Sequence, residues 1–128
     1  MVHKITKGIK ISVETNFEGV FFKESRIQFA FGYTIMIENQ GSDPVKLESR
    51  FWIIKDALNI TKTVSGEGVV GMKPILRPGE IHTYKSGCLL TGFMGAMKGH
   101  YNMINLNTEK IFQVNIPTFK LNTPHVLN

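Results

Sequence analysis

Cysteine is nearly absent from this chain, since Cys88 is the only one among its 128 residues. A single cysteine excludes an intramolecular disulfide, and such usage is typical of a reducing cytoplasm. The sequence also lacks any apolar run near the ~20 residues that span a bilayer, and its start, MVHKITKG, is too polar for an export signal. We therefore expect a soluble, cytoplasmic protein with no membrane insertion.

Runs of like charge are missing as well. Lysine and arginine outnumber aspartate and glutamate by 15 to 10, which gives a net charge of +5. The basic residues are spread from Lys4 to Lys120, a pattern typical of a solvated surface of mixed charge. Nucleic acid binding would require them to converge in space beside exposed aromatic side chains such as Phe21 or Phe22. The sequence alone does not favour a nucleic acid partner.

No segment has the apolar spacing of an amphipathic helix, whereas strict period-two alternation recurs along the chain. Residues 8–17 alternate, and residues 26–40 place six apolar side chains on one side of a strand: Ile27, Phe29, Phe31, Tyr33, Ile35 and Ile37. We interpret residues 18–25 as a loop. The turn-forming residues 39–44 then predict a hairpin between the strand at 26–40 and a strand at 45–56.

About seven to eight short strands separated by glycine-rich or proline-rich turns predict an all-β fold, a β-sandwich of two antiparallel sheets. In the strand at 45–56 we expect Val45, Leu47, Phe51 and Ile53 to share one face. Trp52 falls on the opposite face, where we interpret it as core; an exposed binding anchor beside Arg50 is the alternative.

The later strands are less regular. Residues 81–87 alternate through Ile81 and Thr83, with Tyr84 as a further candidate for the same set. A loop containing Gly87, Gly92 and Gly95 follows, and further strands begin near Ala96 and at 109–117. We expect a single domain over residues 1–128 with loosely ordered ends at 1–7 and about 122–128. The tail becomes ordered if Phe119 and Leu121 dock.

Residues 65–71 read SGEGVVG, and Gly66, Gly68 and Gly71 match the G-x-G-x-x-G spacing of dinucleotide-binding loops. In those folds a helix follows the glycines and presents its N-terminus to the pyrophosphate. Here Pro74 and the pair Pro78-Gly79 exclude such a helix. We favour a loop that needs glycine for its backbone. The alternative is weak nucleotide or pyrophosphate binding by the loop amides, assisted by Lys73 and Arg77.

Potential metal ligands are few and dispersed. The spacing of the four histidines matches no zinc site: His3, His82, His100 and His125. His82 and His100 lie in segments that could be neighbouring strands, so a site completed by Glu80 is an alternative. We expect no metal site and no cofactor.

Nucleophilic catalysis has no recognisable motif. Ser86 and Cys88 lack an elbow sequence or a paired acid and base. We interpret Cys88 as a small packing residue. The sequence therefore predicts no catalytic residues and no enzymatic activity.

Four ordered blocks resemble the bacterial ApaG family over about residues 8–128. They are YTIMIENQGSDPVKLESRFWIIKD at 33–56, VSGEGVVGMKPILRPGE at 64–80, YKSGC at 84–88 and GAMKGHYNM at 95–103. The resemblance implies a fibronectin type III-like, immunoglobulin-like sandwich without established enzymatic activity. It also implies an association with cobalt and magnesium phenotypes, and ApaG-like domains in F-box and polymerase-interacting proteins suggest a protein-interaction module. The pyrophosphate contact proposed for the family maps onto Gly66, Gly68 and Gly71.

The chain departs from the family pattern at three places. Arg50-Phe51-Trp52 stands where the family commonly has Arg-His-Trp, so a role of that histidine does not carry over. Met72 and Lys73 precede Pro74 where Glu-Gln is usual, which weakens a metal role for the loop. The usual proline before Gly95 is missing, and Phe93 and Met94 make that stretch more apolar.

The resulting hypothesis is a non-enzymatic module that binds an unidentified protein. We expect an exposed apolar patch of several hundred Å², formed by Phe21, Phe22, Phe93 and Met94. A homodimer is a second use of such a patch. Binding of a phosphate-bearing small molecule at the glycine loop, and direct binding of a divalent metal, are the alternatives.

Overall fold

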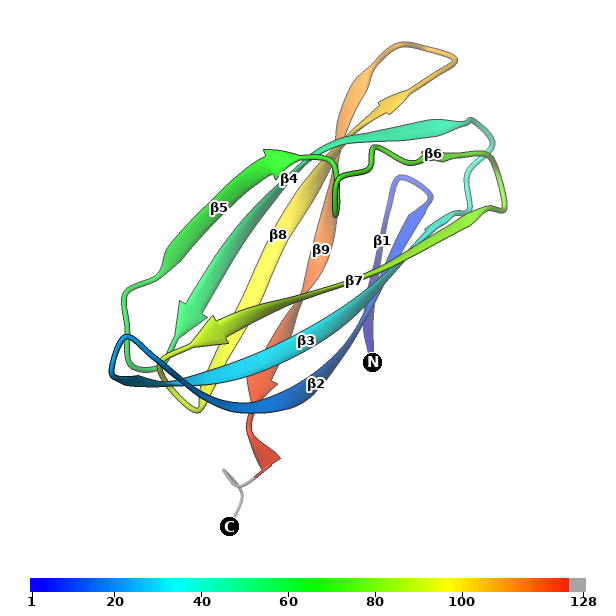
Figure 1. Ribbon diagram of the computed structural model, residues 1–128. Helices are drawn as coiled ribbons and strands as arrows, with labels where there is room; N and C mark the ends of the chain where they lie inside the picture. Colours follow the sequence, from blue (N-terminus) through cyan, green and yellow to red (C-terminus); the bar gives the residue numbers. More distant parts are fainter. Residues whose placement is uncertain (125–128) are drawn as a thin grey trace.

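The computed structural model describes residues 1–124, which form nine β-strands in two antiparallel sheets (Figure 1). One sheet has the order β1-β2-β3-β7; the other has the order β5-β4-β8-β9, with β6 paired to β4. The strands are β1 Val2–Thr6, β2 Ile9–Lys23, β3 Arg26–Asn39, β4 Val45–Asp56, β5 Lys62–Glu67, β6 Ile75–Leu76, β7 Ile81–Leu90, β8 Met94–Asn105 and β9 Ile111–Asn122.

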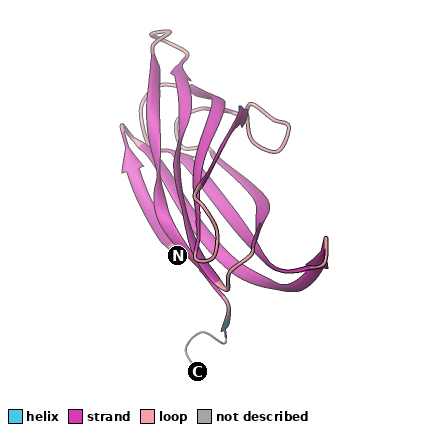
Figure 2. Ribbon diagram, turned by 90° about the vertical axis from the view of Figure 1, so that its left-hand side faces the viewer, coloured by secondary structure: helices cyan, strands magenta, loops and turns pink. Residues whose placement is uncertain are grey.

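The two sheets stack face to face (Figure 2), which confirms the predicted β-sandwich. No helix within residues 1–124 is long and apolar enough to cross a membrane. The core lies between the sheets, where alternate residues of β2 and β3 meet across the strand pair, as Ile11 does with Ile37 and Val13 with Ile35. Period-two alternation therefore predicted the inner face of this sheet correctly.

The loop predicted at residues 18–25 is wrong, because β2 continues to Lys23. A β-bulge between Phe17 and Gly19 interrupts the alternation without ending the strand. The turn itself contains only Glu24 and Ser25, both with positive φ, as in the two-residue turns that match the twist of a hairpin.

The hairpin predicted between 26–40 and 45–56 is also wrong, because β3 and β4 belong to different sheets. The intervening residues cross from one sheet to the other around Asn39, whose side chain is completely buried. Its amide nitrogen donates to the carbonyls of Asp43 (2.8 Å) and Leu76 (2.9 Å), and its oxygen accepts from the amide of Gly41 (2.9 Å). Turn-forming residues marked the turn correctly but did not determine which strands it joins.

A second bulge, between Leu47 and Ser49, reverses the phase of β4. Val45 and Leu47 point into the core, but beyond the bulge Trp52 is the inward residue and is only 3% exposed. Trp52 packs against the rings of Tyr33 and Phe119, with centroids 5.6 and 5.8 Å away. The core assignment of Trp52 is confirmed, whereas Phe51 and Ile53 do not share the face of Val45.

The remaining strands also differ in places from the expectations. In β7 the half-buried side chains are His82, Tyr84 and Cys88, while Ile81 and Thr83 are exposed, and the strand runs through Gly87 to Leu90.

Both ends of the described chain are more ordered than the sequence predicted. Residues 2–6, expected to be loosely ordered, form β1 against β2. Phe119 and Leu121 are buried, so the tail docks as far as β9 extends. His125 and the rest of 125–128 lie outside the described residues.

Candidate functional site

The four apolar residues proposed as a binding patch are all exposed. Their exposed fractions are 52% for Phe21, 80% for Phe22, 45% for Phe93 and 39% for Met94. Figure 1 places the β2–β3 hairpin turn and the β7–β8 connection at the same end of the sandwich. Phe21 and Phe22 are successive residues of one strand and so point to opposite faces of the hairpin.

Two further residues of this end were missed by the sequence analysis. Ile27 lies directly opposite Phe22 in the hairpin, and Val20 shares the same face two residues earlier. Both are about as exposed as Phe21, at 49% and 54%. The available signal was the alternation of Val20 and Phe22. Interpreting 18–25 as a loop concealed it, and Ile27 was grouped with the buried side of the strand at 26–40.

Asp56 ties this end of the sandwich together. Its carboxylate accepts hydrogen bonds from the amides of Thr91 (2.7 Å) and Gly92 (2.9 Å) in the β7–β8 connection, and from Leu58 (3.1 Å) in its own turn. The Thr91 hydroxyl adds a fourth bond at 2.9 Å. Asp56 therefore holds in place the connection that carries Phe93.

The acid sensitivity of Asp56 follows from these contacts. Partial burial raises its pKa, but the hydrogen bonds from Thr91, Leu58 and Gly92 outweigh burial, and the folded pKa lies below the ordinary 3.8. A carboxylate with a lowered pKa stabilises the fold above its unfolded pKa, and this contribution disappears as pH falls through the folded value.

We expect Asp56→Ala to lower the free energy of unfolding by about 2 kcal/mol at pH 7, because hydrogen bonds to a charged acceptor are lost. The difference from the wild type should shrink as the pH is lowered below about 4. Urea unfolding at pH 7 and pH 3 measures both values. A difference that stays constant with pH would contradict the assignment.

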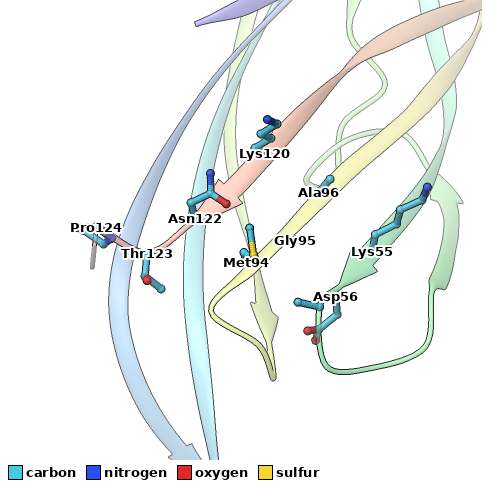
Figure 3. A pocket seen from close by; sticks show the side chains of 10 residues that line it. Lys55, Asp56, Met94, Gly95, Ala96, Lys120, Asn122, Thr123 and Pro124 are labelled. Carbon is cyan, nitrogen blue, oxygen red and sulfur yellow. The ribbon is translucent and has the colours of Figure 1, made fainter. Parts of the chain in front are cut away.

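A surface pocket of about 570 Å³ lies beside Met94 on the five-stranded sheet. Figure 3 shows Lys55 and Lys120 on either side of Ala96, with Met94, Asn122 and Pro124 further along its wall. The pocket thus combines an apolar floor with two cationic side chains at its border.

The glycine loop is packed into the sandwich. Gly66 lies within β5, and Val69 inserts into the hydrophobic core with 1% exposure. The amide of Gly68 donates to the Glu48 carbonyl at 2.8 Å, and Val69 and Met72 exchange backbone hydrogen bonds at 2.8 and 3.0 Å. After Gly71 the chain leads through a short extended segment to β6, so the structure agrees with the exclusion of a helix there.

The two cations proposed to assist this loop are placed differently. Lys73 forms ion pairs with Glu67 (2.9 Å) and Glu48 (3.3 Å), and its hydrogen bond to Glu67 leads the interactions that raise its pKa. Arg77 lies farther away. It directly follows Leu76, which pairs with Val45 of β4, so Arg77 is four residues along β4 from Glu48, roughly 13 Å at ~3.3 Å per residue.

Arg50 is the basic residue that the structure brings to the loop, through bonds to the carbonyls of Glu67 (2.8 Å) and Gly68 (2.9 Å). No sequence pattern had indicated this role. Nucleotide or pyrophosphate binding at this loop stays a prediction. Calorimetry with pyrophosphate tests it, and the absence of heat at millimolar ligand would end it.

The neighbouring-strand hypothesis for His82 and His100 is wrong, because β7 and β8 lie in different sheets. His100 instead stacks on Phe51, with ring centroids 5.2 Å apart. Within residues 1–124 no three histidine, cysteine or acidic side chains converge as a metal site would require. Burial raises the pKa of Cys88 to about 11, so its thiol is protonated at neutral pH.

Comparison with known proteins identifies the family. The chain is 40% identical over 124 residues to Protein ApaG of Bradyrhizobium diazoefficiens, covering 97% of this chain and 95% of that protein. It is 41% identical over 121 residues to Protein ApaG of Methylorubrum extorquens, covering 94% and 92%. A crystal structure described as a putative ApaA protein from Bordetella pertussis matches with a TM-score of 0.81 and 37% identity, over 92% of this chain and 95% of that one. The ApaG domain family matches residues 20–105. The chain therefore belongs to the ApaG family.

Proposed function

We propose that this chain is a non-enzymatic binding module that engages a protein partner through the hairpin end of the sandwich. The contact surface includes both faces of the β2–β3 hairpin, with Phe21 on one face and Phe22 on the other. Phe93 of the β7–β8 connection and Met94 at the start of β8 complete it. The cobalt and magnesium phenotypes associated with the family would then be reached through that partner.

The exposure of Phe22 carries this proposal. A phenylalanine that is 80% exposed next to a hairpin turn leaves most of its apolar surface in water. Val20 and Ile27 extend this surface on the same face. Charged residues Lys23, Glu24 and Arg26 surround the turn, so an apolar centre is bordered by a charged rim, as in protein interfaces.

Affinity capture with a matched pair of variants tests the proposal. The wild type, Phe22→Asp and Ile111→Asp are each immobilised, exposed to native cytosol, and the retained proteins are identified by mass spectrometry. Ile111 is a suitable control because it is 72% exposed and lies at the β8–β9 turn, at the opposite end of the molecule (Figure 1). Both substitutions are on the surface and are expected to change stability by less than about 0.5 kcal/mol.

We expect one partner to be retained by the wild type and by Ile111→Asp, and to be reduced at least tenfold by Phe22→Asp. Retention of the same proteins by all three forms would contradict the assignment of the surface. Sedimentation of the purified chain separates a homodimer from a foreign partner, because a homodimer dissociates into monomers on Phe22→Asp without any added protein.

A further inference from the structure

The outward face of the five-stranded sheet is defined by the pairing of its central strands. Trp52 points into the core, so Phe51, Ile53 and Lys55 of β4 point away from it. Residues directly opposite one another share a face. The outward residues of β8 are therefore Ala96, Lys98, His100 and Asn102, and those of β9 include Gln113, Asn115 and Lys120. We call this surface the outer face.

Four lysines dispersed in the sequence converge on the outer face. Lys55 and Lys120 flank Ala96 in one cross-strand row (Figure 3), and Lys98 follows in the next row. Lys4 of β1 joins them across β9, where it lines a hollow together with Lys98 and Thr118. None of the four forms an ion pair within the described part of the chain.

Within residues 1–124, the carboxylates near the outer face do not form ion pairs with these four lysines. Glu67 is opposite Ser49 at one corner of the outer face, and its carboxylate is held by Lys73 at 2.9 Å. The Asp56 carboxylate, at the end of β4, is directed to the amides of Thr91 and Gly92. The outer face therefore presents a net positive potential to solvent.

An aromatic pair borders this cluster of lysines, in the row next to Lys98. Phe51 and His100 are directly opposite, with their rings 29° from parallel. Burial lowers the pKa of His100, which favours its neutral ring at pH 7. Hollows of about 290 and 470 Å³ lie on the two sides of the pair. The first contains Lys4 and Lys98, and the second contains Asn102, Ser65 and the backbone at Gly66.

We infer that the outer face binds single-stranded nucleic acid. Lysines neutralise backbone phosphates, and the half-buried Phe51–His100 pair leaves ring surface on which the accessible bases of a single strand can stack. The outward rows of side chains repeat every two residues, about 6.6 Å along the β-strands, so an extended nucleic acid chain contacts several rows at once. Amides and hydroxyls beside the platform supply hydrogen bonds to base edges.

Fluorescence anisotropy with labelled fifteen-nucleotide oligo-dT and oligo-U tests the inference on the full chain. For four neutralised phosphates on a single strand, the logarithm of the binding constant is expected to fall with the logarithm of salt concentration with a slope of about −2.8. Lys98→Ala should reduce the magnitude of that slope by about 0.7, whereas Lys85→Ala, on β7 of the other sheet, should leave it unchanged. Binding of both oligonucleotides identifies a general single-strand site, and binding of one identifies a preference between single-stranded DNA and RNA.

Phe51→Leu isolates the stacking contribution, because it keeps an apolar side chain where Phe51 is half-buried. We expect at least about fivefold weaker binding with an unchanged salt slope, since stacking contributes about 1–3 kcal/mol per base. Phe22→Asp should bind like the wild type. Thermal melts establish that each variant is folded.

Three results would overturn the inference. The first is no change in anisotropy at 50 mM salt with protein in large excess. The second is equally tight binding of inorganic polyphosphate or an acidic peptide of matched charge, which would assign the lysines to a different partner. The third is unchanged affinity in Phe51→Leu together with an unchanged slope in Lys98→Ala, which would place any binding elsewhere.

Discussion

Asn39→Ala is expected to lower the free energy of unfolding by about 3 kcal/mol, because each buried polar group left without a partner costs about 1–3 kcal/mol. The side chain of Asn39 is fully buried and makes three hydrogen bonds, to the carbonyls of Asp43 and Leu76 and from the amide of Gly41. These bonds join the end of β3 to the crossing segment and to β6.

The backbone of Asn39 adds to this junction. Its amide donates to the carbonyl of Glu80 at 3.0 Å, and its carbonyl accepts from the amide of Gly79 at 2.7 Å. One residue therefore fixes the place where the chain leaves the first sheet and the turn where it returns. Loss of the side chain should loosen β6 and the Pro78-Gly79 turn together.

Urea unfolding of the variant measures the change. Asn107→Ala is the matched control, because the side-chain nitrogen of Asn107 also donates to Asp43, at 2.8 Å to a carboxylate oxygen, but at an exposed site. The control substitution should lower the free energy of unfolding by less than about 1 kcal/mol, since water replaces the lost hydrogen-bond partner. Equal losses in the two variants would show that burial of Asn39 is not the cause.

The second large expected effect is that of Gly68→Ala, which should lower the free energy of unfolding by about 3 kcal/mol. Gly68 has a φ of +59°, where a residue with a Cβ loses roughly 1 kcal/mol. An added Cβ would also lie 2.2 Å from the carbonyl oxygen of Met72. That oxygen accepts a hydrogen bond from Val69, so it cannot move away without disturbing the residue that inserts into the core.

Gly71→Ala separates the two contributions. Its φ is +75°, yet nothing lies within 4 Å of the position where its Cβ would be. We expect a loss of about 1 kcal/mol, so the difference between the two variants measures the close approach at Gly68. Chemical denaturation of both supplies the values, and identical losses would refute the steric argument. The result also bears on the glycine spacing, because the backbone of this loop accounts for Gly68 and Gly71, and the Arg50 guanidinium, 2.7 Å from the position of an added Cβ, accounts for Gly66.

The candidate site was only partly accessible from the sequence. Exposed Phe21 and Phe22 were identified because they interrupt regular alternation, and exposed Phe93 and Met94 because they make the stretch before Gly95 more apolar than the family pattern. Val20 was missed because the bulge near Gly19 made a continuous strand resemble a loop, and Ile27 because its alternation grouped it with the buried residues of the next strand. The lysines of the outer face were missed for a different reason: Lys4, Lys55, Lys98 and Lys120 lie far apart in the chain, and only strand pairing brings them together.

The sequence by itself determined the all-β class, much of the inner face and the local turns. Side-chain period and glycine or proline geometry are properties of a few adjacent residues, and so Ile35 and Ile37 are buried and Gly79 has a φ of +87° in its turn.

Only the tertiary structure decided which strands are neighbours and which face of β4 is buried beyond Leu47. A sheet is held by hydrogen bonds between segments distant in the chain, and one extra residue in a bulge exchanges the faces without a distinctive local pattern. That long-range pairing buries Trp52 and leaves Phe51 among the lysines of the outer face.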